Sequence, residues 1–113
     1  MTITNEQIKN HSFLREMYQD TYFPKHLVDK GRQILLDLCA AIEATKPQGL
    51  DALYALTHAA TEKFNTLAGE FEDNDSEIET AARDCIGGDF GFIADAYGFT
   101  NADTEELIAP RDW

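Results

Sequence analysis

The chain has 113 residues, of which 43% are hydrophobic, and its formal net charge is −12 at pH 7. This length suits one hydrophobic core and predicts a single domain over residues 1–113, and the hydrophobic content excludes a disordered chain. The charge disfavours nucleic acid and anionic membranes as partners, and the longest apolar run, Leu38–Ile42, is far too short to span a bilayer.

The N-terminal region begins with a helix-start pattern. Thr4 and Gln7 have the spacing of a capping box, which predicts that a helix begins at Asn5. A further apolar face follows at helical spacing, formed by Phe13, Leu14, Met17 and Tyr18. The pattern predicts either one bent helix or two short helices in this region.

Two long helices are predicted next. Pro24 suits the first turn of a helix, and apolar residues recur at three- and four-residue steps over residues 27–42. Pro47 keeps the residue before it out of the helical region, so this helix ends before that proline. The same spacing over residues 50–71 predicts a third helix that packs against the second.

A fourth helix and a short last helix complete the pattern. Ser76 and Glu79 form another capping box, which predicts a helix beginning at Ser76, and Gly98 followed by Phe99 predicts a Schellman stop. A short helix should run over residues 103–109, and no alternation typical of strands competes. The chain is therefore predicted to be all-α, an up-and-down bundle of about four main helices plus a short C-terminal helix.

Three glycines, Gly87, Gly88 and Gly91, lie inside the predicted fourth helix. Each of them weakens a helix interior by about 0.5–1 kcal/mol relative to alanine. The favoured interpretation is close approach of another helix or a local kink. The alternative is a groove in which a ligand or the backbone of a partner approaches the glycines.

The start of the chain has neither the basic region nor the apolar stretch of a signal peptide. The two cysteines, Cys39 and Cys85, are predicted to be reduced core residues. A nucleophilic dyad of Cys85 and His58 would need a lowered thiol pKa, whereas an apolar face and neighbouring acids raise it. We therefore expect a cytoplasmic protein that is non-enzymatic and has no cofactor.

Three stretches of the chain carry a family resemblance. Residues 22–31, 56–65 and 74–83 resemble a family of short acidic bacterial proteins known only as a domain of unknown function. The resemblance covers the whole chain and implies a stand-alone bacterial cytoplasmic protein. It implies no activity, substrate or site residue.

The alternative hypothesis is a metal-binding helical bundle or a metal-dependent enzyme. His11, His26 and His58 fall on three different predicted helices, and Glu62 follows His58 at i+4. A helical bundle can gather such residues into a site with three protein ligands and an open position. The helical ligand motifs His-Glu-x-x-His and Glu-x-x-His are absent, and His58 with Glu62 also suits a simple pair on a helix surface.

The run from Asp73 to Glu77 also has carboxylates at the first, third and fifth positions of a calcium loop. The sixth position falls on Ile78 instead of glycine and the twelfth on Asp84 instead of glutamate, which argues against that loop. These acids instead suit the first turn of the fourth helix, where they complement the helix dipole.

The charge is concentrated in the last fifty residues, where thirteen acids face only two bases. The leading hypothesis is therefore a non-enzymatic acidic interaction module, similar to an inhibitor, immunity protein or antitoxin, that binds a basic protein surface. Its predicted binding residues are Glu70, Glu72, Asp73, Asp75, Glu77, Glu79, Asp84 and Asp89. Mimicry of nucleic-acid phosphates would need these acids in two rows, which a sequence does not show.

Overall fold

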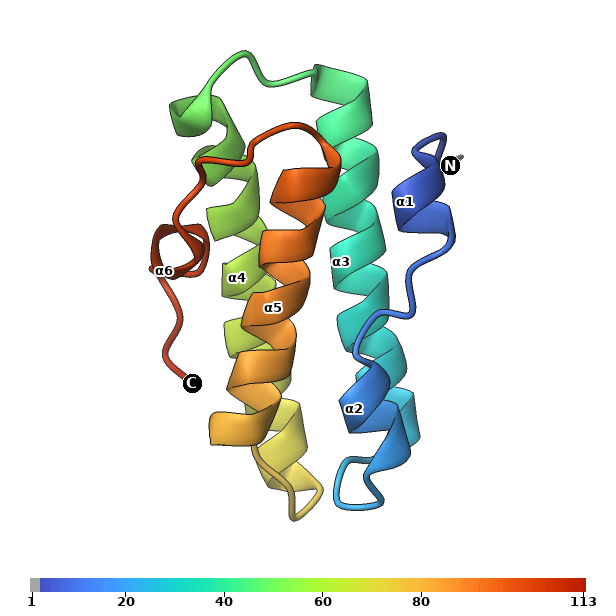
Figure 1. Cartoon of the computed structure of the whole chain (residues 1–113). Coiled ribbons are helices and arrows are strands. Elements are labelled where there is room, and N and C mark those ends of the chain that lie inside the picture. Colours follow the sequence, from blue (N-terminus) through green and yellow to red (C-terminus); the bar gives the residue numbers. More distant parts are fainter. Residues whose placement is uncertain (1–2) are drawn as a thin grey trace.

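The computed structural model describes residues 3–113 and has six helices over that range. They are α1 (Glu6–Lys9), α2 (Arg15–Gln19), α3 (Lys25–Thr45), α4 (Leu50–Asp73), α5 (Thr80–Ala96) and α6 (Thr104–Leu107). Figure 1 shows α3, α4 and α5 as three long helices that run up, down and up, with α1 and α2 beside α3. The described residues contain no strand, and the predicted all-α fold is confirmed.

The N-terminal region adopts the second of the two predicted arrangements. It forms two short helices joined by residues 10–14, so three of the helices are long rather than four. Both short helices pack against α5, and α2 also packs against α3. In the described part of the chain, no helix is long and apolar enough to cross a membrane.

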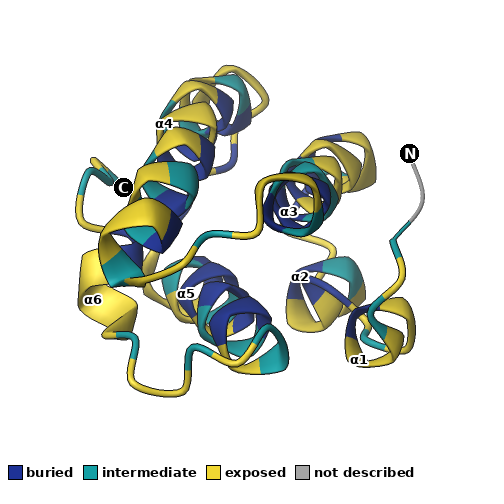
Figure 2. Ribbon diagram, turned by 90° about the horizontal axis from the view of Figure 1, so that it is seen from above, coloured by how far each residue is buried: buried dark blue, intermediate teal, exposed yellow. Residues whose placement is uncertain are grey.

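The core lies where α3, α4 and α5 face one another, as the view from above shows (Figure 2). The apolar spacing predicted this face correctly on α3 and α4. Buried α3 residues at the predicted positions are Leu27, Gly31, Leu35, Leu38 and Ile42. Buried α4 residues at the predicted positions are Leu53, Thr57, Ala60, Phe64, Leu67 and Phe71.

The first capping box is not formed as predicted. The side chain of Asn5, rather than that of Thr4, caps α1, and it accepts hydrogen bonds from the backbone N–H groups of Gln7 and Ile8 at 2.9 and 3.2 Å. The Thr4 hydroxyl instead donates to the Glu43 carboxylate at 2.8 Å. Asparagine and threonine both cap helices well. The Thr4 hydroxyl is bonded to the charged Glu43 carboxylate, so Asn5 caps α1 in its place.

The second capping box is also wrong, because α5 begins at Thr80 and not at Ser76. Ser76 instead closes α4 in a Schellman motif, in which its N–H donates to the Phe71 carbonyl at 2.9 Å. Asp75 provides the left-handed residue of this motif, with φ of 59°. The Ser76 hydroxyl is buried without a hydrogen-bond partner.

The Schellman stop predicted at the end of α5 is confirmed. Gly98 has φ of +89°, a region that favours glycine. The Phe99 N–H donates to the Ala94 carbonyl at 2.8 Å, and the Gly98 N–H donates to the Asp95 carbonyl at 3.0 Å. These two bonds have the pattern of the motif.

Two of the three glycines in α5 allow close approach of α6. A Cβ atom added at Gly87 would lie 3.4 Å from Cδ1 of Ile108, and one added at Gly91 would lie 3.4 Å from Oγ1 of Thr104. Gly88 is exposed and would have no such neighbour within 4 Å. The α6 segment thus lies close to α5 at Gly87 and Gly91, at distances where a Cβ atom would make ordinary van der Waals contact.

Candidate functional site

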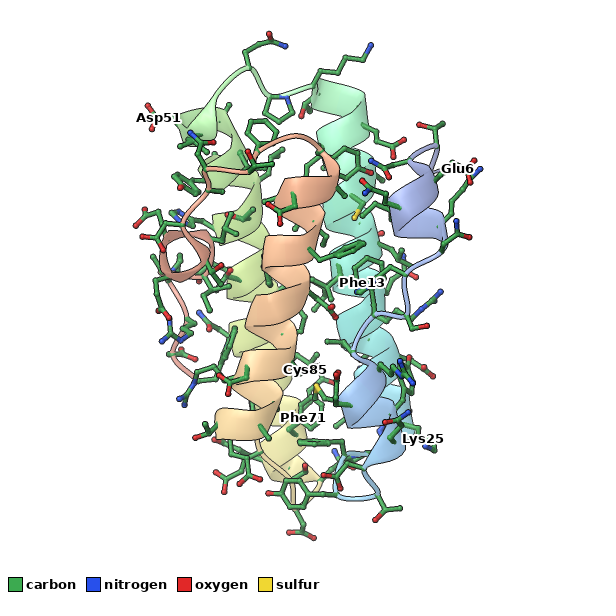
Figure 3. The ribbon with its side chains drawn as sticks, viewed as in Figure 1. Glu6, Phe13, Lys25, Asp51, Phe71 and Cys85 are labelled. Carbon is green, nitrogen blue, oxygen red and sulfur yellow. The ribbon has the colours of Figure 1, made fainter. Side chains whose placement is uncertain are left out.

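The connection between α4 and α5 lies at one end of the bundle, at the bottom of Figures 1 and 3. Seven acids lie in this connection or in the adjoining turns of the two helices. We call this group the acidic end; it consists of Glu70, Glu72, Asp73, Asp75, Glu77, Glu79 and Asp84. All of them except Glu70 are exposed. Glu70 is half-buried and pairs with Nζ of Lys30 at 2.5 Å. The other six carboxylates form no ion pair within residues 3–113.

The nearest basic side chain in sequence does not neutralise the acidic end. Nε of Arg83 donates to the backbone carbonyl of Trp113 at 3.1 Å. A cavity of about 550 Å³ lies close by and is lined by Glu72, Glu77, Asp112 and Trp113, among others. The acidic end therefore combines an open charged surface with a hollow that has carboxylates on its walls.

Asp89 was predicted to belong to this surface, and the structure places it elsewhere. Its side chain is buried, with 8% of the residue exposed, on the face of α5 that packs against the N-terminal region. Oδ1 of Asp89 lies 2.8 Å from Nε2 of His11, and Oδ2 accepts the backbone N–H of Leu14 at 2.7 Å. Burial raises the pKa of Asp89, while the bonds from His11 and Leu14 oppose that rise.

The ring of His11 is fixed on three sides. It stacks on Phe92 with ring centroids 3.9 Å apart and meets the edge of Phe13 at 4.6 Å. Because an ionised carboxylate only accepts hydrogen bonds, Nε2 carries the proton that faces Asp89. Leu14, which follows in the same segment, has φ of 54°, and its N–H is held by the same carboxylate.

The three histidines predicted as metal ligands lie in different surroundings. His26 is exposed in the first turn of α3. His58 lies on α4, where Nε2 is 2.7 Å from the backbone oxygen of Glu106. Glu62 is exposed on the same helix. Among residues 3–113, no group of three or more histidine, cysteine, aspartate or glutamate side chains could hold a metal ion, so the predicted ligands are not brought together.

Both cysteines are free. Burial raises the pKa of the Cys39 thiol to about 12, and burial together with a contact to Glu16 raises that of Cys85 to about 12. Sγ of Cys85 lies 3.4 Å from Oε2 of Glu16. Both thiols are therefore protonated at neutral pH, and neither is an activated nucleophile.

A second carboxylate cluster ties the N-terminus to the bundle. Glu43, near the end of α3, accepts hydrogen bonds from the backbone and hydroxyl of Thr4, the backbone of Asn5 and the hydroxyl of Tyr97. Burial alone would raise the pKa of Glu43, but these bonds lower it to about 2. The carboxylate lines a cavity of about 670 Å³ that also includes Phe99. The oxygens of Glu43 are already hydrogen-bonded within the protein, and the other charged residue that lines this cavity is Lys46.

Sequence reasoning missed both carboxylate clusters. Asp89 has a signal, because it follows Ile86 by three residues and precedes Ile93 by four, which places it on the apolar face of α5. Glu43 has no comparable signal. Its partners Thr4 and Tyr97 lie 39 and 54 residues away, and only the tertiary fold brings them together.

Comparison with curated proteins gave no match, and comparison with solved structures gave none. A family model covers nearly the whole chain, from residue 7 to residue 113. This match confirms the resemblance to a domain of unknown function that the sequence suggested. The chain belongs to DUF5713, a family of unknown function.

Proposed function

We propose that the acidic end binds a basic protein surface and that the protein is a non-enzymatic interaction module, in the manner of an inhibitor, immunity protein or antitoxin. The observation that carries this proposal is the set of six exposed carboxylates with no ion pair among the described residues. Concentrated, uncompensated charge of one sign speeds association with a partner of the opposite sign and selects against like-charged partners.

The cavity beside the acidic end supports the same partner chemistry. Glu72, Glu77 and Asp112 line it together with Trp113. Carboxylates pair with the ammonium or guanidinium group of a lysine or arginine, and an indole ring also attracts such cations. The proposed partner therefore inserts a basic side chain here while its other bases face the exposed acids.

A bacterial cytoplasmic location belongs to the same proposal. It is supported by the two free cysteines, which suit a reducing compartment.

The proposal is tested with two variants that remove equal charge from different places. The neutralised variant carries Glu72→Gln, Asp73→Asn and Glu77→Gln at the acidic end. The matched control variant carries Asp51→Asn, Glu62→Gln and Asp95→Asn, which alter exposed acids elsewhere on α4 and α5. Each protein is immobilised and exposed to lysate of the source organism, and the retained proteins are identified by mass spectrometry.

We expect the wild type and the matched control variant to retain the same basic protein at about 50 mM salt and to release it at about 500 mM, because salt screens exposed charges. The neutralised variant should bind the purified partner at least about tenfold more weakly, since several charge-assisted contacts are lost. Retention of the same proteins by all three would contradict the proposal, as would partners without a basic surface.

A further inference from the structure

The surface between α2 and α3 has a cavity whose lining includes two arginines. This cavity of about 370 Å³ is lined by Arg15 and Arg32, together with His11, Ser12 and Tyr18. No acidic side chain from residues 3–113 lines this cavity. Acids outnumber bases by 21 to 9 in the whole chain, so such a lining is unexpected.

Both arginines are available to a ligand. Each is exposed, and neither takes part in an ion pair with another described residue. A guanidinium group presents several N–H donors in a plane and is therefore well suited to phosphate oxygens. The cavity lined by Arg83 and Arg111 also contains Asp84 and Glu105, whereas no described acid accompanies Arg15 and Arg32, so their two guanidinium groups form an anion-binding surface.

His11 adds an imidazole ring of fixed position to the same wall. Its Nε2–H is directed to Asp89 at 2.8 Å, and Phe92 stacks on the ring, so the ring position is determined by the bundle. Nδ1 is the ring nitrogen left for a ligand, and it is a donor when the imidazole is charged. His11 and Arg15 also line an adjoining cavity of about 370 Å³, whose lining includes the acids Glu16 and Asp89.

The backbone beside this wall is held in a conformation that costs energy. Leu14 has φ of 54°, and a branched residue rarely adopts this left-handed region. The buried carboxylate of Asp89 accepts its N–H at 2.7 Å and keeps it there. Strained residues of this kind cluster at ligand-binding sites, because the surrounding structure fixes their neighbours in place.

We propose that the cavity between α2 and α3 binds the phosphate group of a small phosphomonoester through Arg15, Arg32 and His11. A phosphate dianion matches two or three positive donors better than a carboxylate with a single charge. The volume is that of a small-molecule site, and the rings of Phe13 and Tyr18 on its walls suit an apolar or aromatic body.

The first test titrates inorganic phosphate and phenyl phosphate into isotope-labelled protein, with sodium chloride at equal ionic strength as the reference. We expect both phosphates to shift the amide signals of Ser12 and Arg15 and the ring signals of His11 to saturation. Phenyl phosphate should bind several-fold more tightly, because its ring reaches the aromatic walls. Shifts no larger than those produced by chloride would overturn the proposal. Equal affinity for the two probes would overturn the claim that the aromatic walls bind an organic group of the ligand.

The second test replaces single bases. Arg15→Gln and Arg32→Gln should each weaken phenyl phosphate binding by about tenfold or more, because each removes one charge-assisted contact. Lys63→Gln, at an exposed lysine of α4, removes the same charge away from the cavity and should leave the affinity within about twofold. Equal weakening by all three variants would show only a general charge effect and would overturn the proposal. Amide spectra of the free variants verify that each is folded.

Discussion

Glu43 joins three separate parts of the chain through one carboxylate, because its partners lie in the N-terminal segment and in α5. Its pKa is lowered from 4.5 to about 2 in the folded state. The stabilisation from the ionised form is therefore fully present above about pH 4.5 and is lost as pH falls toward 2.

Glu43→Gln should accordingly lower the free energy of unfolding at pH 7 by about 1–2 kcal/mol, a figure reduced for solvent screening of this half-exposed group. It should also flatten the loss of stability between pH 5 and pH 2. Urea unfolding across this range measures both effects, with Glu62→Gln as the exposed control. If the free energy of unfolding fell equally for Glu43→Gln and the wild type between pH 5 and pH 2, the assigned role of the carboxylate would be contradicted.

Asp89 offers a prediction about proton position as well as stability. Asp89→Ala leaves the Leu14 N–H and the His11 Nε2–H without their acceptor and should cost about 2–3 kcal/mol. Asp89→Asn keeps one oxygen for Leu14 and turns an amide donor toward His11, so the imidazole should move its proton to Nδ1. Nitrogen chemical shifts of the ring report the tautomer. An unchanged tautomer together with full stability would contradict the geometry described for this pair.

The pH dependence of Asp89 has the opposite sign to that of Glu43. Its pKa is raised by burial, so the folded state binds its proton more readily than the unfolded state does. The cost of burying this charge is present at neutral pH and disappears as pH falls below the ordinary value of 3.8. Asp89→Asn does not titrate, so it should remove this contribution from the pH dependence of the unfolding free energy in acid.

At the residue scale, the sequence separates exposed acids from buried ones only in part. It correctly predicted exposed carboxylates on the α4–α5 connection. It missed Asp89 as a buried residue because thirteen acids in fifty residues make each one look like part of a charged surface. The position of Asp89 on the apolar spacing of α5 is the more reliable signal, since burial follows the helical face and not the local composition.

The C-terminal ends of α4 and α5 give two predicted changes in stability of opposite sign. Asp75 and Gly98 occupy the same left-handed position of a Schellman motif, with φ of 59° and +89°. Asp75→Gly should raise the free energy of unfolding by about 0.5–1 kcal/mol, and Gly98→Ala should lower it by about 1 kcal/mol, because only glycine adopts this region without strain. Thermal or chemical unfolding measures both, and a shared direction of change would contradict the motif at one of the two ends.

The helical glycines make a second prediction at this scale. Gly88 is exposed on α5 with open space around it, so Gly88→Ala should stabilise by about 0.5–1 kcal/mol. Gly31 is buried in α3, and a Cβ there would lie 3.0 Å from Leu14 and 3.2 Å from Phe64. Gly31→Ala should therefore destabilise by about 1 kcal/mol, since overpacking outweighs the gain in helix propensity. Stabilisation by Gly31→Ala would show that Leu14 can move aside.

At the element scale, sequence periodicity predicted the long helices well and their beginnings less well. The faces of α3 and α4 follow the predicted residues because a buried stripe needs only the three- and four-residue step. The start of α5 was misplaced by four residues. Ser76 has the spacing of a cap, but the chain continues α4 to Asp73 and uses Ser76 to close that helix, a choice made by tertiary packing.

On the scale of the whole molecule, the charge separates into two regions. The acidic end has unpaired carboxylates around the α4–α5 connection, and the cavity between α2 and α3 carries unpaired arginines. Composition alone predicted the first region, because thirteen acids lie in one half of the chain. It could not predict the second, because Arg15 and Arg32 are far apart in a nearly neutral half and only the packing of α2 on α3 brings them to one cavity.

The unpaired state of the acidic end is tested most directly by the salt dependence of the thermal midpoint at pH 7. Like charges that crowd one end of the bundle destabilise it, and salt relieves this repulsion as the Debye length shrinks below about 10 Å. The wild-type midpoint should rise steadily between about 20 mM and about 500 mM sodium chloride. The neutralised variant should begin higher and rise less, whereas the matched control variant should keep most of the wild-type rise. A wild-type midpoint independent of salt, or equal slopes for the two variants, would contradict an open, uncompensated acidic end.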